Sequence, residues 1–192
     1  MRCPLLPALL MLLPAPAPAD ANAYRAQGKP VRVARTMTVT PPRDWNQLSA
    51  RPGRKAEVWT LDGERLNAVT WFGGIAPGEP LLREPRRRRT LPRYSGAMLL
   101  AEIPELLEST YRSAGGIADF TLTTAAPDPF LGHAGIRFGY AYVDADDLPR
   151  RGEARAAIVA GLLYIVTFDA PRTDYFDRLL GDVHRLTDSA AL

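Results

Sequence analysis

Two short runs rich in β-branched and aromatic residues, KAEVWTL and LNAVTWF, place the strongest constraint on the fold of this chain. They span Lys55–Leu61 and Leu66–Phe72 and flank a segment that contains Asp62-Gly63. An Asp-Gly pair between two such runs is a strong signal for a β-hairpin, because glycine readily adopts the positive φ angle of a tight turn. The chain is therefore expected to build an antiparallel sheet around this hairpin.

Further strands are predicted on both sides of the hairpin. Residues 31–40 are expected to form one strand, and residues 44–46 a turn or a short helix. The apolar run Arg155–Phe168 is long for one strand, since strands average about 5–6 residues. We expect a hairpin that turns near Ala160-Gly161; the alternative is one bent strand with a bulge at Gly161. Alternation indicates two more strands, at Phe120, Leu122 and Thr124 and at Ile136, Phe138, Tyr140 and Tyr142.

Two amphipathic helices complete the predicted elements. The first spans Ala97–Gly115, and Pro104 either kinks it or lies in its first turn. The second follows Pro171, with Thr173 as the N-cap and Asp174 in the first turn. Hairpins combined with a mid-chain helix and a C-terminal helix predict an α+β domain with a mainly antiparallel sheet. The apolar face of the second helix comprises Tyr175, Phe176, Leu179, Leu180, Val183 and Leu186.

Residues 1–21 have the pattern of a secretory signal peptide, with a positive start, an apolar core at Leu5–Pro14 and A-x-A cleavage sites. The core is shorter than the roughly 20 residues that span a bilayer. We expect no transmembrane span after processing; an uncleaved anchor or a disordered tail is the alternative. Residues 22–30 are then a flexible segment and residues 31–189 a single domain. The predicted location is the periplasm or the exterior of the cell.

The chain has one cysteine, Cys3, and it precedes the apolar core. It is therefore not in the position of a lipidated cysteine, and cleavage would leave a mature protein without cysteine. Disulfides, thiolate nucleophiles and cysteine-ligated metals are excluded for such a protein. The sequence has neither a phosphate-binding glycine loop nor a His/Cys cluster with metal spacing, so no cofactor is expected.

The strongest chemical signal is a run of four arginines, Arg86, Arg87, Arg88 and Arg89, with Arg93 nearby. It lies in residues 73–96, a long irregular segment, and such segments tend to be functional or disordered. Guanidinium groups bind phosphate and carboxylate oxygens in pairs. The run is therefore a candidate site for an envelope protein or for an anionic surface of lipid headgroups or lipopolysaccharide.

Two other interpretations of the run remain. The first is a solvated loop, because 22 of the 24 basic residues are arginine and such runs are less surprising in an arginine-rich chain. The second is nucleic-acid binding. A formal net charge of only +3 and the lack of aromatic residues interleaved with the arginines disfavour that interpretation.

Several features together resemble the PsbP-like superfamily, over about residues 31–189. They are a Trp after the first strand (Asp44-Trp45), the WTLDG hairpin (Trp59–Gly63), the mid-chain helix and the ending YIVTFDAPRTDYF (Tyr164–Phe176). The resemblance implies an α/β/α sandwich. Kinship with uncharacterised secreted proteins of alphaproteobacteria is also suggested. The superfamily includes photosystem extrinsic proteins and envelope lipoproteins with different partners, so it implies no catalytic residues and no particular function.

Three weaker candidates accompany the run. His133 with Asp128 is a candidate hydrolase site, although no nucleophile motif is present; His184 is expected beside the polar side of the last helix. Asp144 begins an acidic turn, but a calcium loop needs Gly and Glu at places that here hold Pro149 and Arg155. Six aromatic residues could line an apolar pocket or form the core: Trp45, Trp59, Trp71, Tyr140, Tyr142 and Tyr164.

Three functional hypotheses follow. The first is an exported, non-enzymatic envelope binding or accessory protein whose binding residues are Arg86–Arg89 and Arg93. The second is a hydrolase with its site near His133. The third is a carrier of a small apolar ligand in an aromatic-lined pocket. The sequence does not predict the oligomeric state.

Overall fold

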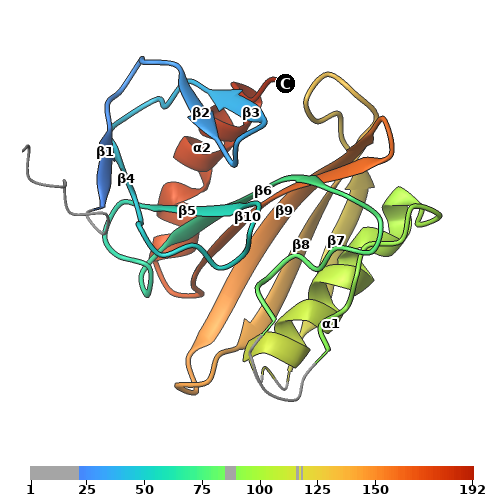
Figure 1. Ribbon diagram of the computed structural model, residues 1–192. Coiled ribbons are helices and arrows are strands. Elements are labelled where there is room, and N and C mark those ends of the chain that lie inside the picture. The colour runs from blue at the N-terminus through green and yellow to red at the C-terminus, as the bar shows by residue number, and fades with distance from the viewer. Residues whose placement is uncertain (1–21, 85–89, 116, 118) are drawn as a thin grey trace, which may run out of the picture.

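The computed structural model describes residues 22–84, 90–115, 117 and 119–192, and Figure 1 shows the arrangement of the elements. The strands are β1 (Ala23–Arg25), β2 (Val31–Val33), β3 (Met37–Val39), β4 (Trp45–Gln47), β5 (Ala56–Thr60), β6 (Ala68–Ile75), β7 (Thr121–Pro127), β8 (Gly135–Val143), β9 (Pro149–Val159) and β10 (Leu162–Pro171). The helices are α1 (Ile103–Gly115), preceded by the 3-10 turn η1 (Leu100–Glu102), and α2 (Tyr175–Asp188).

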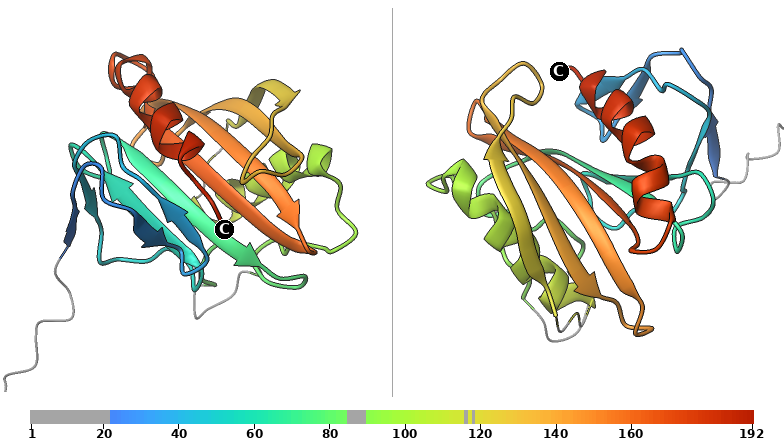
Figure 2. Two further views of the ribbon diagram at one scale, coloured as in Figure 1. Left: turned by 90° about the horizontal axis from the view of Figure 1, so that it is seen from above. Right: turned by 180° about the vertical axis from the view of Figure 1, so that it is seen from behind.

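One eight-stranded antiparallel sheet, in the order β1-β4-β5-β6-β10-β9-β8-β7, separates two helical layers. Figure 2 shows α1 on one side of the sheet and α2 on the other, with the β2–β3 hairpin on the α2 side. Each layer buries its own apolar core against the sheet, and each buried large apolar side chain contributes about 1.5–3 kcal/mol. The predicted α+β sandwich with a mainly antiparallel sheet is confirmed.

Both hairpins with strong turn signals are present. β5 pairs with β6 across the Asp62-Gly63 segment, in a register that matches Ala56 with Phe72. β9 and β10 pair over their whole length and turn at Ala160 and Gly161, whose φ angles are 49° and 76°. The alternative of one long bent strand is therefore wrong.

The prediction of a single strand over residues 31–40 is wrong, because the chain turns back at Ala34 and Arg35, where φ is positive. This turn rests on the sheet. A Cβ atom added to Gly73 of β6 would lie 2.5 Å from the carbonyl oxygen of Ala34 and from the hydroxyl of Thr36. Only glycine leaves room for the turn at this position, so the shape of β2–β3 depends on a residue about 40 positions away.

The N-terminal edge of the sheet also differs from the expectation. The segment around Trp45, expected as a turn or a short helix, is strand β4 and pairs with β5. Residues 23–25, within the stretch expected to be flexible, form strand β1 on the outer side of β4. Strands of three residues carry too few alternating positions for periodicity to reveal them.

The helices begin later than predicted. α1 starts at Ile103 rather than Ala97, and Pro104 lies in its first turn, where its missing N–H is not needed. The N-cap of α2 is Asp174, with φ of 52°, and its side chain caps no backbone N–H. Thr173 as the N-cap is therefore wrong. The buried face of α2 includes Phe176, Leu179, Val183 and Leu186, as predicted.

Candidate functional site

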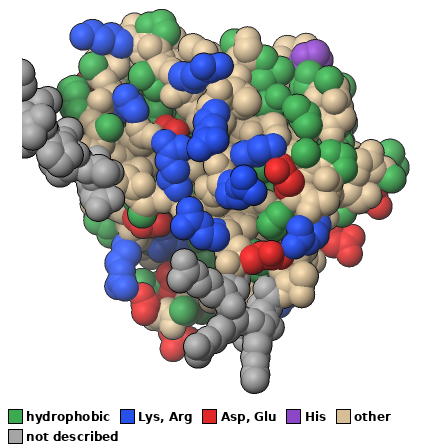
Figure 3. All heavy atoms as spheres, in the orientation of Figure 1, with side chains coloured by type: hydrophobic (Ala, Val, Ile, Leu, Met, Phe, Trp, Pro, Cys, Tyr) green, Lys and Arg blue, Asp and Glu red, His purple; other side chains and the backbone are tan. Residues whose placement is uncertain are grey.

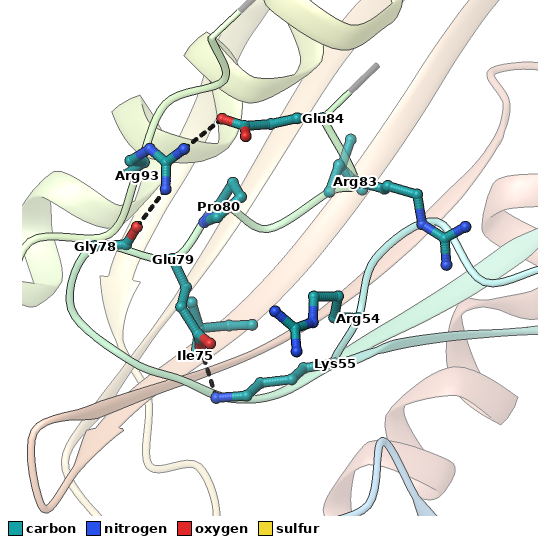
Figure 4. Close-up of a pocket in the computed structure, with 10 residues that line it drawn as sticks. Arg54, Lys55, Ile75, Gly78, Glu79, Pro80, Arg83, Glu84 and Arg93 are labelled. Carbon is teal, nitrogen blue, oxygen red and sulfur yellow. Dashed lines mark hydrogen bonds and ion pairs between the residues drawn. The ribbon is translucent and has the colours of Figure 1, made fainter. Parts of the chain in front are cut away.

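A cavity of about 240 Å³ lies where the loop after β6 passes the connection between β4 and β5. It combines four cationic side chains, two carboxylates and an apolar floor. The lining residues are Arg54, Lys55, Ile75, Gly78, Glu79, Pro80, Leu82, Arg83, Glu84 and Arg93. Figure 4 shows these side chains around the hollow. Positive charge exceeds negative charge in this lining, which favours an anion.

One carboxylate of the cavity is committed to Lys55. The Lys55 Nζ atom lies 2.6 Å from Glu79 Oε2 and 2.7 Å from the carbonyl oxygen of Gly74. Glu79 Oε2 also accepts the backbone N–H of Ala76 at 2.8 Å. The hydrogen bond from Lys55 and then that from Ala76 lower the pKa of Glu79 below its ordinary value. Glu79 is therefore a stable anion that holds Lys55 in place.

The second carboxylate is committed to Arg93. One guanidinium nitrogen of Arg93 lies 2.6 Å from Glu84 Oε1, and another lies 2.7 Å from the carbonyl oxygen of Gly78. Both side chains are about half exposed, so this pair contributes little to stability. The pair instead sets the distance between the two segments of the loop that carry Glu84 and Arg93.

Arg54 and Arg83 are the two cations of the lining that form no ion pair within the described residues. Both are exposed. Figure 4 shows Arg54 pointing into the cavity toward Glu79, whereas the Arg83 guanidinium points outward from the rim. On the face of the molecule seen in Figure 3, Lys and Arg side chains predominate over carboxylates. The cavity thus offers two guanidinium groups that an external anion can contact.

The frame of the cavity is fixed by backbone contacts. The N–H of Gly78 donates to the Tyr94 carbonyl at 2.7 Å, and the N–H of Arg83 donates to the Pro52 carbonyl at 2.7 Å. Gly53 packs so closely that an added Cβ would lie 2.4 Å from the carbonyl oxygen of Leu81. The three segments that form the cavity are therefore held together by contacts between their own backbones.

The predicted binding residues divide into two groups. Arg86, Arg87, Arg88 and Arg89 lie outside the described residues. Arg93 is described, lines the cavity, and is paired with Glu84. The chain joins Glu84, at the cavity, to Thr90 through the arginine run. Sequence analysis missed Arg54, Lys55 and Arg83 as cavity residues, because they stand apart from the run and are joined to it only by the fold.

The candidate hydrolase pair is not assembled. Asp128 accepts hydrogen bonds from Arg155 at 2.8 Å and from Arg137 at 3.1 Å. His133 is exposed, and its backbone pairs with that of Phe130. No hydrogen bond joins the His133 ring to Asp128 in the part of the chain that the structure describes. The carboxylate is occupied by cations from β8 and β9 and does not orient the imidazole.

The other polar candidates have structural partners. Asp144 accepts the backbone N–H groups of Asp146 and Leu148, both at 3.0 Å, and it lies 3.4 Å from Arg150. The acidic turn is thus closed by its own backbone. His184 on α2 contacts Glu153 of β9, with 2.6 Å between Nε2 and Oε1. That contact joins the helix to the sheet.

The six aromatic candidates all lie in the two cores, where none is more than 8% exposed. Trp45, Trp59, Trp71 and Tyr164 pack on the α2 side, and Tyr140 and Tyr142 on the α1 side. Trp59 and Trp71 meet edge to face, with 6.2 Å between ring centroids. These side chains stabilise the sandwich and leave little aromatic surface for an apolar ligand.

A buried carboxylate in the α1-side core was not predicted. Asp169 of β10 accepts hydrogen bonds from the hydroxyls of Tyr111, Tyr140 and Tyr142 at 2.9, 3.0 and 3.1 Å. Burial raises the pKa of Asp169, against the opposing effect of these hydroxyls. Burial, followed by the nearby Asp169 carboxylate, also raises the pKa of Tyr140. The residues come from α1, β8 and β10, so only the fold brings them together.

Comparison with solved structures gives the fold a name. The cyanobacterial PsbP protein (CyanoP) of Synechocystis sp. PCC 6803 superposes with a TM-score of 0.56 at 12% sequence identity, covering 95% of this chain and 98% of that one. The fold is PsbP-like. The resemblance inferred from the WTLDG hairpin and the C-terminal ending is confirmed at the level of the fold, and at this identity it shows nothing of function.

Two more distant likenesses accompany the PsbP-like match. LpqN of Mycobacterium tuberculosis, involved in cell envelope biogenesis, has a TM-score of 0.39 at 8% identity over 90% of this chain and 84% of that one. A Pseudomonas aeruginosa protein of unknown function has a TM-score of 0.47 at 12% identity over 78% and 94%. Neither is similar enough to support a conclusion. No family model matches the chain, and no curated protein matches it.

Within the described residues, neither α1 nor α2 has the length and apolar character that a membrane-crossing helix requires.

Proposed function

We propose that this PsbP-like protein is an exported, non-enzymatic accessory protein that binds an anionic surface of the cell envelope. Its binding residues are Arg86–Arg89, which follow the cavity residue Glu84 in the sequence, together with the cavity that Arg93 lines. The observation that carries the proposal is that Arg54 and Arg83 in this cavity lack ion-pair partners among the described residues. Export rests on the signal-peptide pattern of residues 1–21.

The partner of this surface is an array of phosphate groups, such as lipid headgroups or the phosphates of lipopolysaccharide. A cluster of basic residues attracts an anionic membrane by about 1 kcal/mol for each residue near the surface. The attraction is electrostatic, so it weakens as ionic strength rises. Because no catalytic arrangement forms around His133, catalysis is not part of the proposal.

Vesicle flotation tests the proposal. We expect the protein to float with vesicles that contain phosphatidylglycerol and not with purely zwitterionic ones. Replacing Arg86–Arg89 by glutamine lowers the partition coefficient by roughly tenfold or more, since four charges are removed. A matched control replaces four exposed arginines elsewhere by glutamine and has a smaller effect: Arg32, Arg35, Arg172 and Arg178.

An equal loss of vesicle binding in the two variants would contradict a dedicated binding surface. The arginine run would then be a solvated loop. If neither protein binds anionic vesicles, and crosslinking in cells captures a protein only with the native run, the partner is an acidic protein face instead of a membrane.

A further inference from the structure

The cavity has two chemically different halves. Ile75, Pro80 and Leu82 provide an apolar floor, in which Pro80 and Leu82 are partly exposed and Ile75 is almost completely buried. The guanidinium of Arg54 lies across this floor (Figure 4), and Arg83 stands at the rim. A ligand that satisfies both halves has an anionic group and a compact apolar group next to it, because a purely hydrated ion leaves the floor unused.

The charges indicate what kind of anion fits. Lys55 and Arg93 are neutralised by Glu79 and Glu84, at 2.6 Å in each pair. The lining is then left with the positive charges of Arg54 and Arg83. A phosphate monoester carries about −1.5 to −2 at neutral pH, whereas a phosphodiester carries only −1. The two positive charges of Arg54 and Arg83 therefore match the charge of a phosphate monoester better than that of a phosphodiester.

The backbone N–H groups of three lining residues are not available to bind the anion. The N–H groups of Gly78 and Glu79 already donate to the carbonyls of Tyr94 and Ala76, at 2.7 and 3.0 Å. The N–H of Arg83 donates to Pro52. These groups form no anion-binding nest, so affinity depends on the two arginine side chains. The same bonds hold the cavity open, which reduces the entropy lost on binding.

We propose that the cavity is a binding site for a phosphate monoester bearing a compact apolar group, with Arg54 as the inner phosphate contact and Arg83 as the outer one, an extension that rests on the function proposed above. The apolar group packs on Ile75, Pro80 and Leu82. The monoester belongs either to a membrane lipid or to a soluble ester, since both present the same two parts to the cavity.

Titration of the protein with phenyl phosphate tests this site, with binding followed through the backbone amide NMR signals of Gly78, Glu79 and Leu82. We expect saturable binding that weakens below about pH 6, where the monoester loses its second charge. Arg54→Gln weakens binding roughly tenfold, the loss of one charge-assisted hydrogen bond, and Arg83→Gln weakens it less. The matched control is Arg51→Gln, an exposed neighbour that does not line the cavity.

Three further probes, compared with phenyl phosphate, define the ligand class. Inorganic phosphate binds more weakly than phenyl phosphate, and dihexanoyl phosphatidylglycerol binds more weakly than dihexanoyl phosphatidic acid. Equal affinities in the first pair would overturn the apolar contact, and equal affinities in the second would overturn the monoester. Tighter binding of dihexanoyl phosphatidic acid than of phenyl phosphate points to a lipid source, and the reverse points to a soluble ester. No saturation, or an unchanged affinity in Arg54→Gln, would overturn the site itself.

The two proposals fail separately. If the Arg86–Arg89 variant loses vesicle binding but still binds phenyl phosphate, both stand. If native protein ignores vesicles while the cavity binds phenyl phosphate, the surface proposal fails alone. If vesicle binding depends on the run while the cavity binds no probe, the cavity proposal fails alone.

Discussion

Arg155 of β9 and Arg54 of the β4–β5 connection are both arginines, yet their surroundings differ completely. Arg155 is 7% exposed. It donates to Asp128 at 2.8 Å, to the Pro129 carbonyl at 3.0 Å and to Asp188, the last residue of α2. Arg54 is exposed and has no ion-pair partner among the described residues.

The difference separates arginines that hold the fold together from arginines that can bind something else. A guanidinium such as that of Arg155, whose three nitrogens all donate to oxygens of the protein, stabilises the native state and cannot change partner without cost. A guanidinium beside a preformed cavity, with no ion-pair partner among the described residues, adds little to stability and remains available. In a chain with 22 arginines, residue type alone therefore says little about function.

The largest expected effect is on the free energy of unfolding when Arg155 is replaced. Arg155→Ala lowers the free energy of unfolding by about 2–3 kcal/mol, because it leaves Asp128 without its closest cation; the partial exposure of the carboxylates limits the loss. Arg54→Ala changes it by less than about 0.5 kcal/mol. Urea unfolding of both variants measures the contrast, and similar losses would show that Arg54 is also structural.

A second prediction concerns the frame of the cavity. Gly53→Ala places a Cβ atom 2.4 Å from the Leu81 carbonyl oxygen, and backbone must move to relieve the overlap. We expect a loss of about 1–2 kcal/mol in unfolding free energy, together with weaker binding of phenyl phosphate. An affinity equal to that of the native protein, at reduced stability, would show that the spacing of the two segments does not matter for the ligand.

Asp169 is a buried carboxylate whose hydrogen-bond partners are three tyrosine hydroxyls, so it extends the comparison to an acidic group. Its pKa is raised by burial, so between its unfolded and folded pKa values the native state binds more protons. The stability contributed by Asp169 is complete below the unfolded pKa of about 3.9 and is lost as pH rises through the higher folded value.

Asp169→Asn removes this titration. The unfolding free energy of the native protein minus that of the variant is expected to fall as pH rises above about 4, by no more than about 1.4 kcal/mol per pH unit. Urea unfolding across this range measures the difference. A difference that rises with pH would mean that the tyrosine hydroxyls outweigh burial.

The smallest predicted effect lies far from the cavity. Gly181 is in the middle of α2, and the nearest atom to an added Cβ is 3.9 Å away. Gly181→Ala should raise the free energy of unfolding by about 0.5–1 kcal/mol, because alanine loses less backbone entropy in a helix. Thermal unfolding measures the gain. Phenyl phosphate affinity should remain unchanged, which makes this variant the matched glycine control for Gly53→Ala.

Sequence analysis succeeded where structure depends on neighbours along the chain. The β9–β10 hairpin and the apolar face of α2 follow from local alternation and helical spacing. It failed where distant residues decide. The β2–β3 turn needs Gly73, and Asp128, placed near His133 in sequence, is bound by Arg155 from another strand.

The site divides in the same way. The arginine run can be recognised in the sequence, but the cavity cannot. Arg54 and Arg83 are 29 positions apart in the numbering and line the same cavity only because Pro52 and Gly53 pack against the loop after β6. No periodicity or motif signals a contact of this kind, since it depends on one missing Cβ and one backbone hydrogen bond.

The central position of β10 has a consequence for synthesis. β10 pairs with β6 on one side and with β9 on the other, so it joins the N-terminal strands to the β7–β9 meander. These two halves cannot unite in the sheet before β10 has been made, because β10 lies between them and follows both in the sequence. Pairing between Val69 and Phe168 closes a long loop, and such contacts slow folding. A chain built in this order cannot complete its sheet until β10 is available.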